Sequence, residues 1–128
     1  MKLVLRFFLA IVACTLLTAY TNISSNNLKQ GLSDLEAQEY NSALIEFNSE
    51  IKLNPYNASA YNYRGVVKAK KGDFDGSLSD YDMSIKLEPN NSETFGNRGI
   101  ARARTGDVQG AIRDFDEAIL IDPKNGNS

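Results

Sequence analysis

The chain of 128 residues contains no histidine and only one cysteine, and both shortages limit its chemistry. Without histidine it offers neither a histidine general base nor a histidine metal ligand. Because Cys14 has no second cysteine to pair with, stability must come from packing rather than from an internal disulfide. Asp73-Phe74-Asp75-Gly76 resembles the start of a calcium loop, but its glycine comes too early and the distal glutamate is missing. The sequence therefore predicts a protein that is not an enzyme and that has no catalytic site, metal site or cofactor.

Basic residues are too few and too scattered to indicate nucleic-acid binding. The chain has 14 lysines and arginines against 16 acidic residues. Without residues 1–23 it would lose Lys2 and Arg6 but no acid, which gives a net charge of −4. The one basic cluster, formed by Lys68 and its neighbours Lys70 and Lys71, is expected at a helix end, where cations favourably face the helix dipole. A mildly acidic domain without a basic stripe is not expected to bind nucleic acid.

Residues 1–23 differ in composition from the rest of the chain. Lys2 and Arg6 precede an apolar run from Phe7 to Tyr20, and this segment contains no acidic residue. A basic start, a short apolar core and small residues at its exit are typical of a secretory signal. The run is shorter than the ~20 residues that a permanent membrane span requires. The alternative is that these residues form an unusual first helix of the folded domain, although nothing in the remaining sequence requires them.

Three fates of this segment remain open. Ile11-Val12-Ala13-Cys14 resembles the lipobox of bacterial lipoproteins, in which the cysteine becomes the lipidated first residue. The chain stays apolar after Cys14, however, where lipoproteins usually turn polar. Cleavage after Ala19 and retention as an uncleaved anchor are the alternatives. All three predict an exported protein of the cell envelope or periplasm, which contacts a membrane only through this segment.

An internal repeat of 34 residues organises most of the remaining chain. A shift by 34 places Arg64 on Arg98, Gly65 on Gly99, Gly72 on Gly106, Asp80 on Asp114 and Pro89 on Pro123. A fixed period without insertions is the signature of a stacked repeat array. Within a unit, a helical pattern from residue 58 to 71 is followed by a Gly-Asp break and by a second apolar stripe of helical period. Because short turns force neighbouring helices to be antiparallel, each unit is predicted to be a helical hairpin.

The pattern resembles the tetratricopeptide repeat, a 34-residue helical hairpin with small and aromatic residues at set positions. The matching scaffold residues are Tyr61, Gly65, Tyr81, Pro89, Phe95, Gly99, Phe115 and Pro123. A more diverged unit begins at Ser24 and carries Gly31, Phe47 and Pro55 at matching positions, but it departs from the pattern at Asn27 and Glu50. The resemblance implies an all-α solenoid of three hairpins. Its repeats would span residues 24–57, 58–91 and 92–125, with a separate signal segment at 1–23 and a tail at 126–128.

The resemblance also implies a binding surface, because the first helices of successive hairpins line a concave groove in such families. The matching residues are Leu28, Leu32, Leu35, Asn62, Val66, Lys70, Glu93, Ile100 and Arg104. The lysines and asparagines with which some members clamp a peptide carboxylate are essentially absent, since the matching positions hold Leu28, Leu32, Tyr63, Glu93 and Asn97. An apolar groove suits a helix or an extended apolar peptide. We therefore expect an interaction module with a protein or peptide partner, unless side chains such as Val66 pack against neighbouring helices instead.

The end of the last repeat indicates a competing function. No polar capping helix follows it, and terminal repeats normally need one for solubility. Ile112, Ile119 and Ile121 are therefore expected to be exposed and to form an apolar strip. The alternative function is a structural unit that self-assembles through this strip, for example as a homodimer.

One pairing of charges can be predicted as well. Arg64 and Arg98 occupy a position where the family commonly has leucine, and the same two units carry Asp80 and Asp114. An arginine fork can bind a carboxylate through two hydrogen bonds, so we expect these residues to pair within or between hairpins. The alternative is two independent surface charges.

Overall fold

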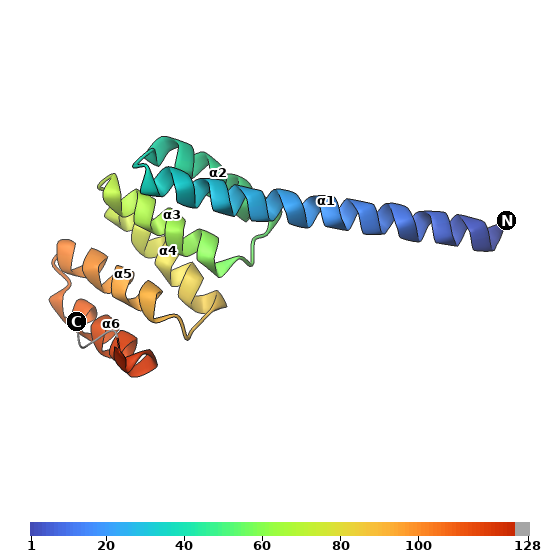
Figure 1. Cartoon of the computed structure of the whole chain (residues 1–128). Coiled ribbons are helices and arrows are strands. Elements are labelled where there is room, and N and C mark those ends of the chain that lie inside the picture. The colour runs from blue at the N-terminus through green and yellow to red at the C-terminus, as the bar shows by residue number, and fades with distance from the viewer. Residues whose placement is uncertain (125–128) are drawn as a thin grey trace.

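The structure is a computed structural model that describes residues 1–124, and six α-helices occur within that range. They are α1 (Lys2–Glu36), α2 (Tyr40–Leu53), α3 (Ala58–Lys70), α4 (Phe74–Leu87), α5 (Ser92–Arg104) and α6 (Val108–Ile121). They pair as the hairpins α1–α2, α3–α4 and α5–α6, which stack in chain order (Figure 1). The predicted all-α solenoid of three hairpins is confirmed, while Asn125 and the expected tail lie outside the described residues.

The hairpin turns have the caps that the sequence predicts. Gly72 follows α3 with a φ of +86°, a left-handed conformation that glycine adopts without a Cβ clash. The Asp73 side chain then accepts a hydrogen bond of 2.9 Å from the backbone N–H of Gly76, which caps the start of α4. Gly106 and Asp107 repeat this arrangement before α6. In these two hairpins the glycine therefore ends the first helix, and the aspartate that follows it caps the start of the second.

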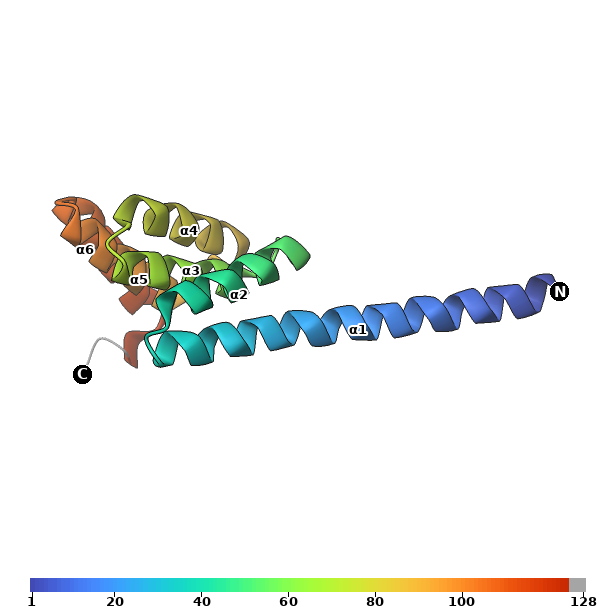
Figure 2. The same cartoon turned by 90° about the horizontal axis from the view of Figure 1, so that it is seen from above.

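Residues 1–23 do not form a separate element, because they continue directly into the first hairpin. α1 runs unbroken for 35 residues, and its N-terminal part projects from the solenoid as a rod (Figures 1 and 2). Helix α1 is long and apolar enough to span a membrane. Signal sequences near an N-terminus have the same length and composition. Its most apolar stretch of 18 residues is entirely exposed. At Ser24 the helix therefore continues without a break, and it passes from the exposed rod into the packed first hairpin.

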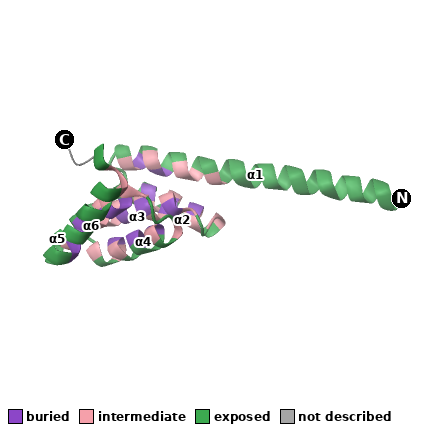
Figure 3. Ribbon diagram, turned by 90° about the horizontal axis from the view of Figure 1, so that it is seen from below, coloured by how far each residue is buried: buried purple, intermediate pink, exposed green. Residues whose placement is uncertain are grey.

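The core lies along the inner faces of the stacked hairpins (Figure 3). In the first hairpin Phe47 is fully buried and packs against Gly31, where a Cβ atom would come within 2.6 Å of the Phe47 ring. Gly65 and Gly99 leave the same space for the Tyr81 and Phe115 rings, at 2.7 Å in each case. The glycine on the first helix of each hairpin therefore admits an aromatic ring from the second helix.

The predicted arginine–aspartate pairs are confirmed and lie within hairpins. The Arg64 Nε and Nη2 atoms donate to the two Asp80 oxygens at 2.9 and 2.7 Å, and Arg98 binds Asp114 in the same way at 3.0 and 2.7 Å. Both aspartates are almost completely buried. Each arginine also reaches the preceding hairpin, since Arg64 donates to Asn48 and Arg98 donates to Asp82. One guanidinium thus joins the helices of its own hairpin and links that hairpin to the one before.

Candidate functional site

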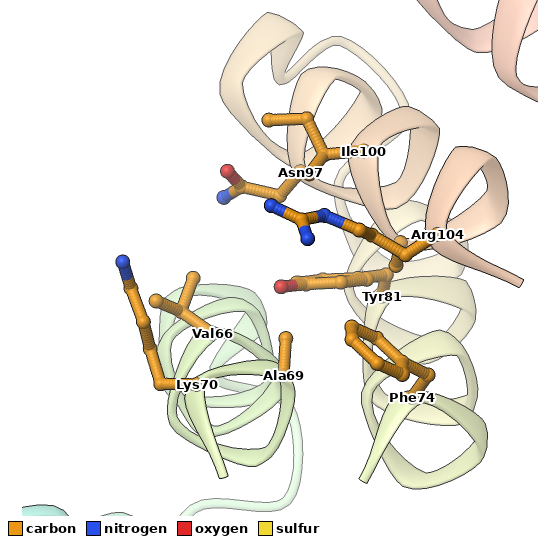
Figure 4. Close-up of a pocket in the computed structure, with 9 residues that line it drawn as sticks. Val66, Ala69, Lys70, Phe74, Tyr81, Asn97, Ile100 and Arg104 are labelled. Atoms are coloured by element: carbon orange, nitrogen blue, oxygen red, sulfur yellow. The ribbon is translucent and has the colours of Figure 1, made fainter. Parts of the chain in front are cut away.

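A pocket of about 350 Å³ opens between α3, α4 and α5 (Figure 4). It is lined by Val66, Ala69 and Lys70 of α3, Phe74 and Tyr81 of α4, and Asn97, Ile100, Ala101 and Arg104 of α5. Four of the expected groove residues, two from each first helix, therefore come together at one site. The pocket lies between the second and third hairpins, where α3 and α5 are the first helices.

The floor of the pocket comes from α4 and was not predicted as part of the binding surface. Phe74 is half-buried, and Tyr81, which the sequence indicated only as a scaffold aromatic, is 2% exposed. Both belong to the apolar stripe that packs α4 against its neighbours, so their position in the sequence does not distinguish a floor from a core. The gap between α3 and α5 exposes this part of the stripe to the groove.

The rim of the pocket carries two free cations, Lys70 and Arg104. Both side chains are exposed, and within residues 1–124 neither makes a hydrogen bond or an ion pair. Their neighbours in the same last helical turns behave differently, since Lys68 binds Asp80 at 2.9 Å and Arg102 binds Asp114 at 2.9 Å. The helix dipole favours all four cations. Only Lys70 and Arg104 remain available to a ligand.

The Tyr81 hydroxyl is directed into the pocket, between the residues of α3 and those of α5 (Figure 4). It has no hydrogen-bond partner in the part of the chain that the structure describes. Burial raises the pKa of this phenol well above its ordinary value, and the negative charges of Asp80 and Glu93 raise it further. The hydroxyl therefore keeps its proton and can donate a hydrogen bond to an acceptor on a ligand.

A polar network closes the groove at its other end. Asn62 is 2% exposed and donates to Glu93 at 3.2 Å, and Asn97 donates to Asn62 at 3.1 Å. Glu93 also adds to the effect of burial in raising the pKa of Tyr63. Both polar groups of the Asn62 side chain are used in hydrogen bonds that link α3 to α5, so Asn62 positions these helices. Glu93 is exposed and stays accessible to solvent.

Five predicted groove residues do not line the pocket: Asn62 and Glu93, which belong to the polar network, and three leucines of α1. Leu28, Leu32 and Leu35 are half-buried on α1 and pack against the core cluster that contains Phe47 and Val67. The cluster contains side chains of α2 and α3, so these leucines fill the contact between the first two hairpins. Val66 and Ile100, the equivalents of Leu32 on α3 and α5, instead line the pocket.

The outer face of α6 forms the expected apolar strip. Ile112 and Ile119 are 47% and 49% exposed, Ile121 is only partly exposed, and the strip also includes Val108, Phe115 and Leu120. A shift by 34 residues shows what such a face normally meets. Leu78 and Ile85, the equivalents of Ile112 and Ile119 on α4, are half-buried where α5 packs against α4.

The N-terminal rod contains the remaining candidate residue, Cys14. Its side chain is exposed in the apolar part of α1. Among residues 1–124 there is no cluster of acidic and cysteine side chains that could hold a metal ion.

Comparison with known proteins identifies the fold. No protein-family model and no curated protein matches the sequence. Among solved structures, an Arabidopsis OM64 TPR domain is similar with a TM-score of 0.80 at 23% identity, over 82% of this chain and 87% of that one. The TPR2B domain of yeast Sti1, solved in a complex with pHsp70, gives 0.78 at 21% identity, over 83% and 86%. The first TPR of Spaghetti (RPAP3), bound to an HSP90 peptide, gives 0.77 at 18% identity, over 80% and 81%. The resemblance to tetratricopeptide repeats is confirmed for the fold: the chain folds as a TPR domain.

Proposed function

We propose that the protein is a non-enzymatic interaction module that binds a protein or peptide partner in the concave groove. The observation that carries this proposal is the pocket between α3, α4 and α5, which combines an apolar floor with unpaired polar groups at its rim. Ligand pockets of this size are typically apolar with a few placed polar groups. Two of the structural neighbours are described in complexes with a peptide or protein partner, which supports the same use of the fold here.

Site-specific photo-crosslinking tests this proposal. A photoreactive residue replaces Ile100 at the pocket in one variant and the exposed Ser79 of α4 in a control variant. If the groove is the binding surface, cells that express the full chain should give crosslinked protein adducts only from the pocket position. Adducts from both positions, or from neither, would contradict a partner in the groove.

For the N-terminal segment we propose export and attachment to the cell envelope. Support comes from the exposed apolar surface of the rod and from the two basic residues at its start, Lys2 and Arg6. The alternatives remain lipidation at Cys14, cleavage near Ala19 and an uncleaved anchor. Mass spectrometry of the purified protein separates them, because each predicts a different N-terminus and only lipidation is lost in Cys14→Ser. A cytosolic protein with an intact, unmodified N-terminus that does not sediment with membranes would contradict all three.

A second candidate function is self-association through the α6 strip. One molecule can self-associate and bind a partner in the groove at the same time only if the two surfaces are separate. They are separate here, because no α6 residue lines the pocket. The exposure of Ile112 and Ile119 supports this candidate. Analytical ultracentrifugation of the full chain in detergent should show a concentration-dependent dimer that Ile112→Lys abolishes. A monomer at every concentration would exclude it.

A further inference from the structure

The Tyr81 hydroxyl is a feature that the repeat scaffold does not require. The equivalent residues of the first and third hairpins are Phe47 and Phe115, and their rings occupy the space left by a glycine just as the Tyr81 ring does. Packing therefore needs only the ring. In the second hairpin alone, a hydroxyl is added to an almost completely buried ring, and it points into the pocket without a partner (Figure 4). Because the hydroxyl lies at the open pocket, water reaches it in the free protein, and an acceptor on a ligand would replace that water.

The two rim cations stand above this hydroxyl from opposite sides. Lys70 and Arg104 are equivalent under the shift of 34, and both line the pocket. The equivalent residue of the first hairpin is Glu36, so this concentration of positive charge belongs to the second and third hairpins only. Two cations without an ion pair thus line one pocket, and they oppose the negative charges of Asp80 and Glu93 near the Tyr81 ring.

Apart from Asn97, the rest of the pocket surface is apolar. Phe74 forms part of the floor, and Val66 and Ile100 form the facing walls. Such a surface contributes binding free energy by removing apolar groups from water. The pocket therefore offers the Tyr81 hydroxyl, the Asn97 amide, two positive charges and an apolar contact area within about 350 Å³.

We propose that the pocket binds an internal peptide segment in which an acidic side chain stands next to an apolar one. The carboxylate accepts a hydrogen bond from the Tyr81 hydroxyl and faces Lys70 and Arg104, while the apolar side chain covers Phe74 and Val66. This inference rests on the proposed function of the groove as a peptide site and specifies its ligand. A basic segment would meet like charges, and a purely apolar one would leave the hydroxyl and both cations desolvated without a partner.

A peptide selection tests the ligand class directly. The probe is a library of random dodecapeptides, fused to a phage coat protein through their C-termini so that no free peptide carboxylate is available. The target is the full chain in lipid nanodiscs, with empty nanodiscs for counter-selection. We expect enriched peptides that share an acidic residue next to an aliphatic or aromatic one. Enriched peptides without acidic residues would overturn this inference and leave the groove function intact, whereas no enrichment at all would overturn both.

Variants of the pocket then test each contact with one selected peptide, labelled and followed by fluorescence anisotropy. Tyr81→Phe should weaken binding about tenfold or more, as expected for one lost hydrogen bond to a charged group. The combined Lys70→Glu and Arg104→Glu change should weaken it more than tenfold and reduce its salt dependence. The matched control is Arg113→Glu, an exposed cation of α6 away from the pocket, which should leave affinity unchanged. Unchanged affinity in Tyr81→Phe, with an unaltered melting temperature, would exclude the hydroxyl as a ligand contact.

Discussion

The first hairpin and the two that follow hold their buried carboxylates in different ways. In the second and third hairpins the acid is on the second helix, and two cations of the first helix bind it; for Asp80 these are Arg64 and Lys68. In the first hairpin one of the two buried acids, Asp34, lies on the first helix. Its oxygens accept from the neutral donors Gln30 at 2.7 Å and Ser42 at 2.5 Å. One fold thus tolerates either an ion-pair network or a neutral hydrogen-bond network at the same contact between helices.

The first hairpin also breaks two other rules that its neighbours keep. Gln38 has a φ of +62° at the position where the other hairpins have Gly72 and Gly106. Glu50 is fully buried where the others have Ser84 and Ala118. One Glu50 oxygen accepts from Ser24 and Asn57, while the other has no partner among the described residues. The aromatic-on-glycine contact is kept in this hairpin although its polar contacts differ.

The largest effect is expected from neutralising the buried acids. Asp80→Asn leaves Arg64 and Lys68 facing an amide, and we expect it to lower the free energy of unfolding by about 3 kcal/mol. Asp34→Asn should cost only about 1 kcal/mol, because its partners are neutral and the Ser42 hydroxyl can accept as well as donate. Urea unfolding of the full chain in nanodiscs measures both. Equal costs would mean that the two networks are energetically equivalent.

An intermediate effect is expected from a lysine on equivalent faces of α4 and α6. Leu78→Lys places a charge on a half-buried face that packs against α5 and should cost about 2 kcal/mol. Ile112→Lys makes the same change on the exposed α6 strip and should alter stability by about 0.5 kcal/mol or less. Thermal unfolding of the two variants at low protein concentration provides the comparison. A large loss in Ile112→Lys would show that the strip is covered in solution.

The smallest effect is expected at the turn of the first hairpin. Gln38→Gly relieves a left-handed conformation of a residue with a Cβ and should raise the free energy of unfolding by about 1 kcal/mol. The reverse change, Gly106→Gln, should lower it by a similar amount, because nothing within 4 Å would obstruct the new side chain. Differential scanning calorimetry of both variants checks the sign. A destabilising Gln38→Gly would indicate that the glutamine side chain makes a contribution of its own.

The second and third hairpins could be predicted almost completely, because the 34-residue period fixes their helices, caps and charge pairs together. The pocket could be predicted only in part, since Val66 and Ile100 follow from the groove positions while Phe74 and Tyr81 look like core residues. The continuity of α1 could not be predicted. It contains no proline and no glycine before Gly31, and hydroxyls such as those of Thr18 and Thr21 bond back to backbone carbonyls three residues before them, which keeps polar side chains compatible with a helix.

The unbroken α1 determines how the groove can be presented. The 22 residues of α1 that precede the first hairpin, 2–23, form a helix about 33 Å long, which is stiffer than a loop. If its apolar end is held in a membrane, the helix keeps the solenoid away from the membrane surface and restricts its rotation. The direction in which the pocket faces would then be set by the tilt and the rotation of a single helix. Moving the pocket one-quarter of a turn would take only one residue added to or removed from that helix.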